Sequence, residues 1–184
     1  MKRSTWIVLV IFLALVGLLF YLKQNKPATP EEVEATPAPP VEYLFNENDG
    51  LPTHIEIMSN TGDQVSIERN DAGEWVLIQP IETEANQGSA EAAASQLTSL
   101  RIVSKPEVAP VDAGLVQPSY TMKVELTGGT VKTVRIGDLA PTESGYYTSV
   151  DGSDSVLIVS KTGLDALLTM VTSPPYANTP TPEP

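Results

Sequence analysis

The sequence predicts an α+β fold in which two β-meander-plus-helix halves pack as one antiparallel-sheet domain, preceded by a single N-terminal transmembrane helix. Three observations support this prediction. An uncharged apolar run fills residues 6–22, and short segments of alternating apolar and polar residues recur between Asn- and Gly-rich turns. Two further stretches, 87–100 and 162–171, carry apolar residues at helical spacing.

The apolar run at residues 6–22 reads WIVLVIFLALVGLLFYL and contains no charge. As a helix it would be about 26 Å long, slightly less than the roughly 30 Å hydrocarbon core of a bilayer. Trp6 and Tyr21 stand at its two ends, where amphipathic rings prefer the headgroup region. A cleaved signal peptide is the alternative, but the run exceeds a usual h-region and no A-x-A-like site follows it. We therefore expect an uncleaved anchor in the lipid bilayer.

Charge is distributed unevenly along the chain. Four of the 11 basic residues lie in the first 26 positions, which hold no acid, so the chain from Pro27 onward carries seven bases and 23 acids, a net charge of −16. Lys2 and Arg3 precede the apolar run and predict residues 1–5 in the cytoplasm, with the C-terminal domain on the other side of the cell membrane. The acidity predicts no nucleic-acid partner, because phosphates would be repelled.

Proline-rich segments mark the limits of the folded part. Residues 23–40 include PATPEEVEATPAPP, which predicts an extended linker, and residues 173–184 read SPPYANTPTPEP, which predicts a disordered tail. Between them, residues 41–172 have the commonest size of a single domain.

Alternation inside residues 41–172 predicts half-buried antiparallel strands. Four segments show it: 54–57, 65–68, 122–126 and 134–136. Two wholly apolar segments, 75–78 and 156–159, predict central strands that are covered on both faces.

Two helices are expected to close the two meanders. Asn86 is a suitable N-cap for the helix at 87–100, and Thr162 for the helix at 162–171. Because a single meander of this size has too little core, the two halves should pack as one unit.

Several motifs follow one another in an order that resembles a known family. They are Trp75-x-Leu77-x-x-Pro80, Ala85-Asn86, Gly114-Leu115-x-x-Pro118, Gly137 and Tyr146-Tyr147. The pattern is similar to the bacterial envelope family called domain of unknown function 4340, over most of residues 41–171, although the family usually has Asp where this chain has Asn86. The resemblance implies a membrane-tethered protein, and some members are similar in genomic setting to gliding-motility-type ABC transporter components. The family has no established catalytic residues, so none are carried over.

The residues offer little reactive chemistry. One histidine and no cysteine exclude an ordinary zinc site, and we expect no catalytic residue, cofactor or metal. His54 should lie on the exposed face of a strand beside Glu56. The segments 46–50 and 151–154 resemble calcium loops only in part, because both lack the closing bidentate Glu, and hairpin turns explain them better. Three glutamates near the first helix are expected to form a solvated rim: Glu82, Glu84 and Glu91.

We expect a non-catalytic interaction or scaffold domain that is anchored in the membrane and lies outside the cytoplasm. It would contact a protein partner in the membrane or envelope, and the resemblance implies a transporter assembly as the context. The alternative is an envelope module that binds a glycan, small molecule or cation, favoured by the acidic surface and by Tyr120, Tyr146 and Tyr147 as an aromatic patch. A hydrolase that uses His54 as its base is a third hypothesis.

Overall fold

The computed structural model describes residues 12–18, 21, 40–153 and 155–177. The chain divides after Pro40 into two units. Residues 12–18 are helical, and no helix among the described residues is long and apolar enough to cross a membrane. Most of the predicted transmembrane helix at 6–22, and all but the last residue of the predicted linker at 23–40, lie outside the described residues.

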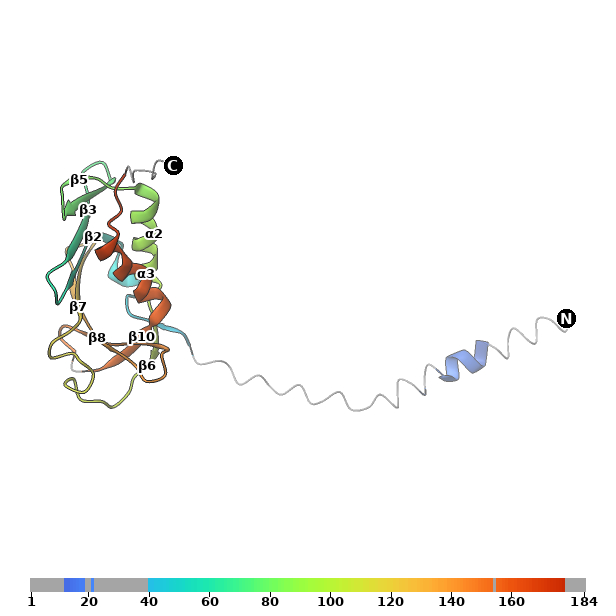
Figure 1. Cartoon of the computed structure of the whole chain (residues 1–184). Coiled ribbons are helices and arrows are strands. Elements are labelled where there is room, and N and C mark those ends of the chain that lie inside the picture. Colours follow the sequence, from blue (N-terminus) through green and yellow to red (C-terminus); the bar gives the residue numbers. More distant parts are fainter. Residues whose placement is uncertain (1–11, 19–20, 22–39, 154, 178–184) are drawn as a thin grey trace, which may run out of the picture. The chain divides into compact units, whose positions relative to one another are not determined.

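The second unit is one antiparallel sheet of ten strands, with two helices on one of its faces (Figure 1). The strands are β1 (Glu42–Tyr43), β2 (Pro52–Ser59), β3 (Gln64–Arg69), β4 (Trp75–Gln79), β5 (Thr83–Glu84), β6 (Arg101–Ser104), β7 (Tyr120–Leu126), β8 (Val131–Leu139), β9 (Gly145–Val150) and β10 (Leu157–Ser160). The helices are the 3-10 helix η1 (Glu47–Asp49), α2 (Gln87–Thr98) and α3 (Lys161–Thr172). The predicted α+β class with one antiparallel-sheet domain is confirmed.

Two meanders meet in the middle of this sheet. The spatial order is β1-β6-β10-β9-β8-β7-β2-β3-β4-β5, so β2 to β5 and β7 to β10 each run in sequence. The first strands of the two meanders, β2 and β7, pair antiparallel, with Ile55 opposite Val124 and Ile57 opposite Met122. Each meander is followed or closed by one helix, as the sequence predicts.

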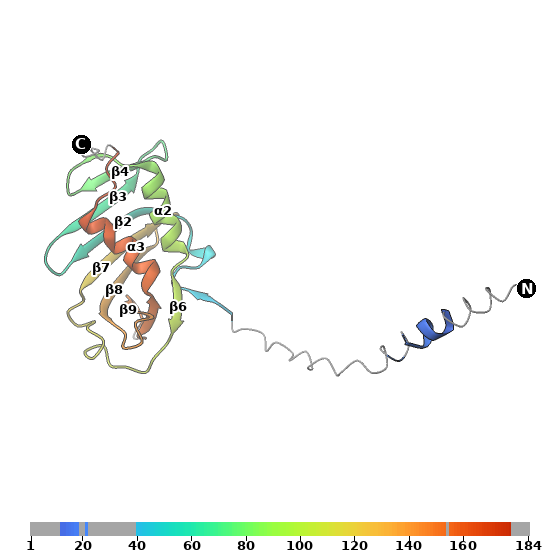
Figure 2. The same ribbon diagram turned by 45° about the vertical axis from the view of Figure 1, so that its right-hand side comes forward.

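The main core lies between the sheet and the two helices, which cross the same face (Figure 2). Alternate residues of β2 and β7 point into it and are fully buried, including Ile55, Ile57 and Val124. From the other side, Leu97 of α2 and Leu164 of α3 are also fully buried. Alternation in the strands and helical spacing in the helices thus select the same face for burial.

A smaller apolar cluster lies on the opposite face of the sheet, under the loop between β6 and β7. Ala113 and Leu115 of the loop pack with Val156 and with the half-buried Tyr147. The loop approaches β8 at Gly137, and the Asp138 amide donates a hydrogen bond to the Ala113 carbonyl at 3.0 Å. Val156 of this cluster directly precedes β10, and Ile158 and Val159 of β10 are buried. The expectation of a central, covered strand at residues 156–159 is therefore met in part, because β10 is the third strand from one edge.

The expectation that residues 75–78 form a central strand is wrong. β4 is the second strand from the other edge, beside the two-residue strand β5. Trp75 and Leu77 are buried under the helices, whereas Val76 and Ile78 are only half-buried on the opposite face. The apolar segment 75–78 therefore forms a strand with one buried face and one partly covered face, and not a strand in the centre of the sheet.

The helix ends differ slightly from prediction. Asn86 is the N-cap of α2, as expected, and its side-chain oxygen accepts a hydrogen bond from the Ser89 amide at 3.0 Å. α3 begins one residue before Thr162, so Ser160 occupies the N-cap position and Thr162 is not the cap.

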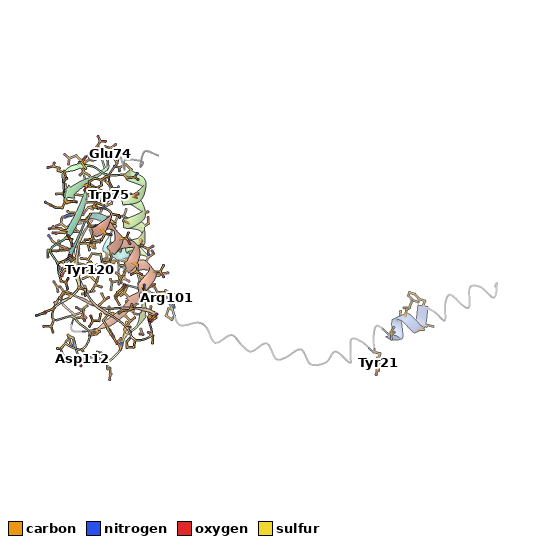
Figure 3. The ribbon with its side chains drawn as sticks, viewed as in Figure 1. Tyr21, Glu74, Trp75, Arg101, Asp112 and Tyr120 are labelled. Carbon is orange, nitrogen blue, oxygen red and sulfur yellow. The ribbon has the colours of Figure 1, made fainter. Side chains whose placement is uncertain are left out.

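Trp75 is held by a three-residue clamp that joins β3, β4 and α2 (Trp75 is labelled in Figure 3). The indole Nε1 donates to Glu91 Oε2 at 2.9 Å, and Arg69 Nη2 donates to the same oxygen at 2.6 Å. The Arg69 guanidinium lies 4.4 Å from the centre of the indole ring, a cation–π distance. The hydrogen bond from Trp75, supported by Arg69 and opposed by desolvation, lowers the pKa of Glu91. Glu91 is therefore part of the packing and not only of a solvated rim.

The close approach at Gly137 yields a stability prediction. A Cβ there would lie 2.1 Å from the Ala113 carbonyl oxygen, so Gly137→Ala should push the loop off β8 and cost about 1–3 kcal/mol. Thermal unfolding should fall, and amide exchange should rise in residues 108–116. The control is Gly88→Ala, whose Cβ would meet only Asn86 Oδ1, at 3.5 Å. In a helix this change should be neutral or stabilising, and an equal loss in both variants would contradict the argument.

The clamp predicts a pH dependence. Because the pKa of Glu91 is lower in the folded chain than in the unfolded chain, its contribution to stability is fully present above the ordinary pKa of a glutamate and is lost as the pH falls through the lowered pKa. Glu91→Gln should reduce the loss of stability as the pH falls below the ordinary pKa of a glutamate, measured by urea unfolding at each pH. Glu107→Gln, at an exposed loop position, should keep the original slope, and an unchanged slope in Glu91→Gln would exclude this role.

Candidate functional site

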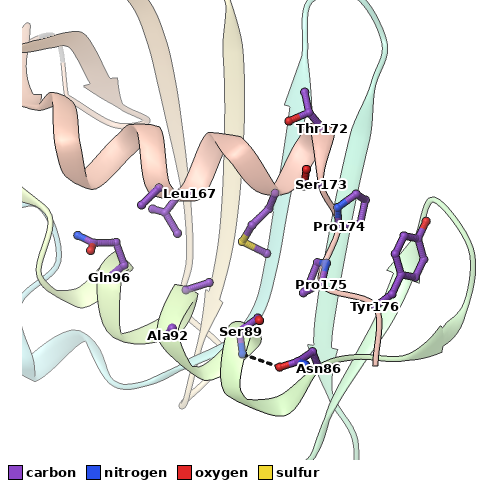
Figure 4. Close-up of a pocket in the computed structure, with 13 residues that line it drawn as sticks. Asn86, Ser89, Ala92, Gln96, Leu167, Thr172, Ser173, Pro174, Pro175 and Tyr176 are labelled. Carbon is purple, nitrogen blue, oxygen red and sulfur yellow. Dashed lines mark hydrogen bonds between the residues drawn. The ribbon is translucent and has the colours of Figure 1, made fainter. Parts of the chain in front are cut away.

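A groove of about 630 Å³ lies between α2, α3 and the segment that follows α3 (Figure 4). α2 contributes one side and the C-terminal half of α3 the other. Residues 173–177, here called the C-terminal strap, close one end of the groove and run from the end of α3 to the beginning of α2.

The C-terminal strap is fixed to the domain by backbone contacts. The Asn86 amide donates to the Pro175 carbonyl at 2.8 Å, and the Ala177 amide donates to the Glu84 carbonyl at 3.1 Å. Tyr176 forms an antiparallel bridge with Ala85, and Pro175 is buried. The predicted disordered tail at 173–184 is thus wrong for residues 173–177, and residues 178–184 lie outside the described part.

The floor of the groove is apolar, and three of its residues are alanines. Ala92 and Ala93 of α2 face Ala166, Leu167 and Met170 of α3. Alanine leaves space between two helices that larger residues would fill, so the groove stays open between well-packed elements. None of the residues that line it carries a charge.

Polar side chains stand around this floor. They are Asn86, Ser89, Gln96, Ser173 and Tyr176, together with Thr172. The Asn86 oxygen is used by the helix cap, and the Gln96 Nε2 lies 3.4 Å from Ser99 Oγ. Among the described residues, the Asn86 amide nitrogen has no acceptor and the Gln96 side-chain oxygen has no donor. One donor and one acceptor are therefore available to a ligand.

A hydrogen-bonded group fixes the N-terminal end of α3 beside the groove. Asp165 accepts hydrogen bonds from the Tyr146 hydroxyl and from Lys161 Nζ, both at 2.7 Å. Burial opposes ionisation of Asp165, but the bonds from Lys161 and Tyr146 prevail and lower its pKa. Burial, and then the bond to Asp165, raises the pKa of Tyr146. The group holds α3 on β9 and thereby sets the position of the groove wall.

His54 lies on the opposite face of the sheet, between Ser66 and Glu125. These three residues, here called the His54 row, resemble a catalytic triad in their order. His54 Nε2 is 2.8 Å from Ser66 Oγ, and His54 Nδ1 is 3.6 Å from Glu125 Oε1. The His54 side chain is only 18% exposed, which corrects the expected exposed surface histidine. Lys123 lowers the pKa of Glu125, burial opposes this effect and His54 adds to it.

This row is poorly arranged for acyl transfer. Ser66 is 3% exposed and lies in the middle of β3, where the strands on both sides use their amides in ladder pairing. Free backbone amides that could stabilise an oxyanion are the usual requirement of such chemistry. The geometry instead favours a role in which His54 ties β3, β2 and β7 together.

The acids of the predicted turn segments are bound to bases. Asp49 lies 2.6 Å from Lys132 Nζ, and Asp151 lies 2.7 Å from Arg135 Nη2. Asp154 lies outside the described residues. Within the described part of the chain, no group of three or more His, Asp and Glu side chains could hold a metal ion.

The tyrosines do not form the aromatic patch that the sequence suggests. Tyr120 and Tyr146 pack against the main core, whereas Tyr147 packs against the cluster on the opposite face of the sheet. Neighbouring strand residues point to opposite faces, so Tyr146 and Tyr147 are separated by the sheet itself.

The groove was missed by reasoning from the sequence alone. Its walls come from α2 and α3, about 75 residues apart in the sequence, and its strap has the proline-rich composition of a disordered tail. The exposed positions of the two helices carry a signal in the sequence that could have indicated the groove. Ala92 and Ser95 of α2, and Ala166 and Thr169 of α3, are exposed but uncharged in an acidic chain, whereas a solvated helix face normally carries charge.

Comparison with known proteins places the domain in a family. No curated protein and no solved structure matches the chain. The sequence pattern of one family, described as domain of unknown function (DUF4340), matches residues 75–173, more than half of the chain. The matched region begins at Trp75 and includes both helices of the groove. The chain therefore belongs to the family that carries the domain of unknown function DUF4340.

Proposed function

We propose that the chain is a single-pass membrane protein whose α+β domain acts outside the cytoplasm as a non-catalytic interaction domain. The apolar run at 6–22 supplies the anchor, and the proline-rich segment at 23–40 supplies the spacer. The domain would contact a protein partner in a membrane-associated assembly, with a transporter as the favoured context.

The observation that carries this proposal is the uncharged groove between α2 and α3. It presents an apolar floor and hydrogen-bonding side chains, which suit contact with another molecule. The described residues that line it include no acidic or basic side chain. The His54 row, on the other face, is built into the sheet and supports a structural role.

A second candidate function is binding of a small ligand, and the size of the groove favours it. A volume of about 630 Å³ lies within the range of roughly 300–1,000 Å³ that is typical of small-molecule sites. Thermal shift of the full chain against neutral glycans, apolar small molecules and divalent cations separates this candidate from protein contact. Stabilisation that Ala92→Trp removes would favour the ligand.

The anchor yields a fractionation prediction. The full chain should remain with membranes after carbonate washing, because about 17 apolar residues prefer the hydrocarbon core. Leu15→Arg combined with Leu18→Arg should release it, since each charge near the centre of a helix costs about 2.5–3.5 kcal/mol of insertion. Leu51→Arg, at a position that is 66% exposed in the domain, is the matched control and should not change the distribution. Release of the unmodified chain from membranes by carbonate washing would contradict the proposed anchor.

The interaction proposal predicts capture of a partner. A photo-crosslinking residue placed at Ala92, in the groove, or at Val131, on the opposite face, should give adducts with a membrane or envelope protein in native membranes. The same residue placed in the released Leu15→Arg/Leu18→Arg chain should lose these adducts. Absence of any adduct at both positions, above a sample without light, would count against an interaction domain.

A further inference from the structure

We infer that the groove between α2 and α3 binds an extended, uncharged peptide segment of a protein partner, and that its rim recognises the peptide backbone. The inference rests on the proposed interaction function and adds the chemistry of what is bound. Three features support it: the free amide groups of the rim, the small apolar floor, and the distribution of charge over the domain.

The free groups of the rim match a peptide backbone. Side-chain amides carry the same donor and acceptor as a peptide group, and Asn86 offers its donor while Gln96 offers its acceptor. These residues stand at opposite ends of the groove face of α2, about 15 Å apart at 1.5 Å per residue. An extended peptide covers that distance in about four to five residues. The Ser89 hydroxyl lies between the two amides along the same face.

The floor selects small, uncharged side chains. Ala92, Ala166 and Leu167 offer apolar contact and no hydrogen-bond partner. A charged side chain placed there would lose its hydration without a counter-charge, which is costly. Alanine, valine or leucine side chains of the bound segment would instead exchange water for apolar contact.

Charge excludes the nearest competing occupants. Six of the seven basic residues of the domain are already in ion pairs with acids of the same domain, and the chain from Pro27 onward has a net charge of −16. A second copy would bring the same negative charge. Residues 178–184 of the chain add the charge of Glu183, and three of the seven are prolines without an N–H to donate. A neutral segment of another protein meets none of these costs.

The experiment uses the full chain in nanodiscs and measures fluorescence anisotropy of dansyl-labelled, end-blocked pentapeptides. The neutral probe contains alanine, valine and leucine only. Two probes replace its central residue by lysine or by glutamate, and a fourth has N-methylated backbone amides. The neutral probe should bind best, the lysine probe several-fold more weakly and the glutamate probe at least tenfold more weakly. The N-methylated probe should lose at least tenfold. Empty nanodiscs correct for partition into lipid.

Two variants locate the binding, each with a matched control. Ala92→Trp fills the groove and should remove binding, whereas Val131→Trp, on the opposite face of the sheet, should not. Gln96→Ala removes the free acceptor and should weaken binding three- to tenfold, whereas Gln117→Ala, in an exposed loop, should change it less than twofold. Gln96→Ala keeps the test open if Ala92→Trp does not fold, as judged by circular dichroism.

Equal binding of the neutral and N-methylated probes, or equal binding by Ala92→Trp and Val131→Trp, would overturn the assignment of the groove. The interaction function is tested separately by crosslinking in native membranes. Adducts at Val131 alone, with no peptide binding in the groove, would keep the interaction domain and remove the groove as its contact. No adducts at either position would remove the proposed function, whatever the peptides do.

Discussion

The pairing of β2 with β7 holds the domain together. It joins two meanders, neither of which has enough core alone, into one sheet with a continuous apolar face. Ile55 opposite Val124 and Ile57 opposite Met122 place four fully buried side chains at this junction. Both helices cover the joined face, so the groove between them exists only because the two halves share one sheet. A shift of one residue in this pair would turn the two buried side chains of the shifted strand away from the core.

Two local devices then fix the helices that form the groove. At the beginning of α2, the Trp75 clamp joins the helix to β3 and β4 through Glu91. At the beginning of α3, Tyr146 and Lys161 hold Asp165 and thereby attach the helix to β9. The C-terminal strap joins the end of α3 to the N-cap of α2. The groove is thus bounded by elements that are each held by hydrogen bonds, and a pre-formed site loses less entropy when it binds.

The sequence predicts the local elements well and their assembly less well. Alternation at 54–57 and 122–126 identifies strands, and Asn86 identifies a helix start, because these signals depend on neighbouring residues. The position of β4 near an edge depends on partners far along the chain, and so does the burial of Ser66 beneath His54. The groove depends on local helix signals and also on the packing of two helices that are far apart in the sequence. Its strap carries the prolines of an unfolded tail, and only contact with Asn86 and Glu84 distinguishes it from one.

The route of the C-terminal strap has a mechanical consequence. Any force applied beyond Ala177 acts first on the two backbone bonds that join the strap to Asn86 and to Glu84 of the edge strand β5. Because these bonds lie at one end of the groove, tension on the C-terminus would deform the groove before it separates the central strands of the sheet. Under the proposed anchoring at residues 6–22, a pull on the other end of the chain would therefore change the shape of the groove and with it the binding of its ligand.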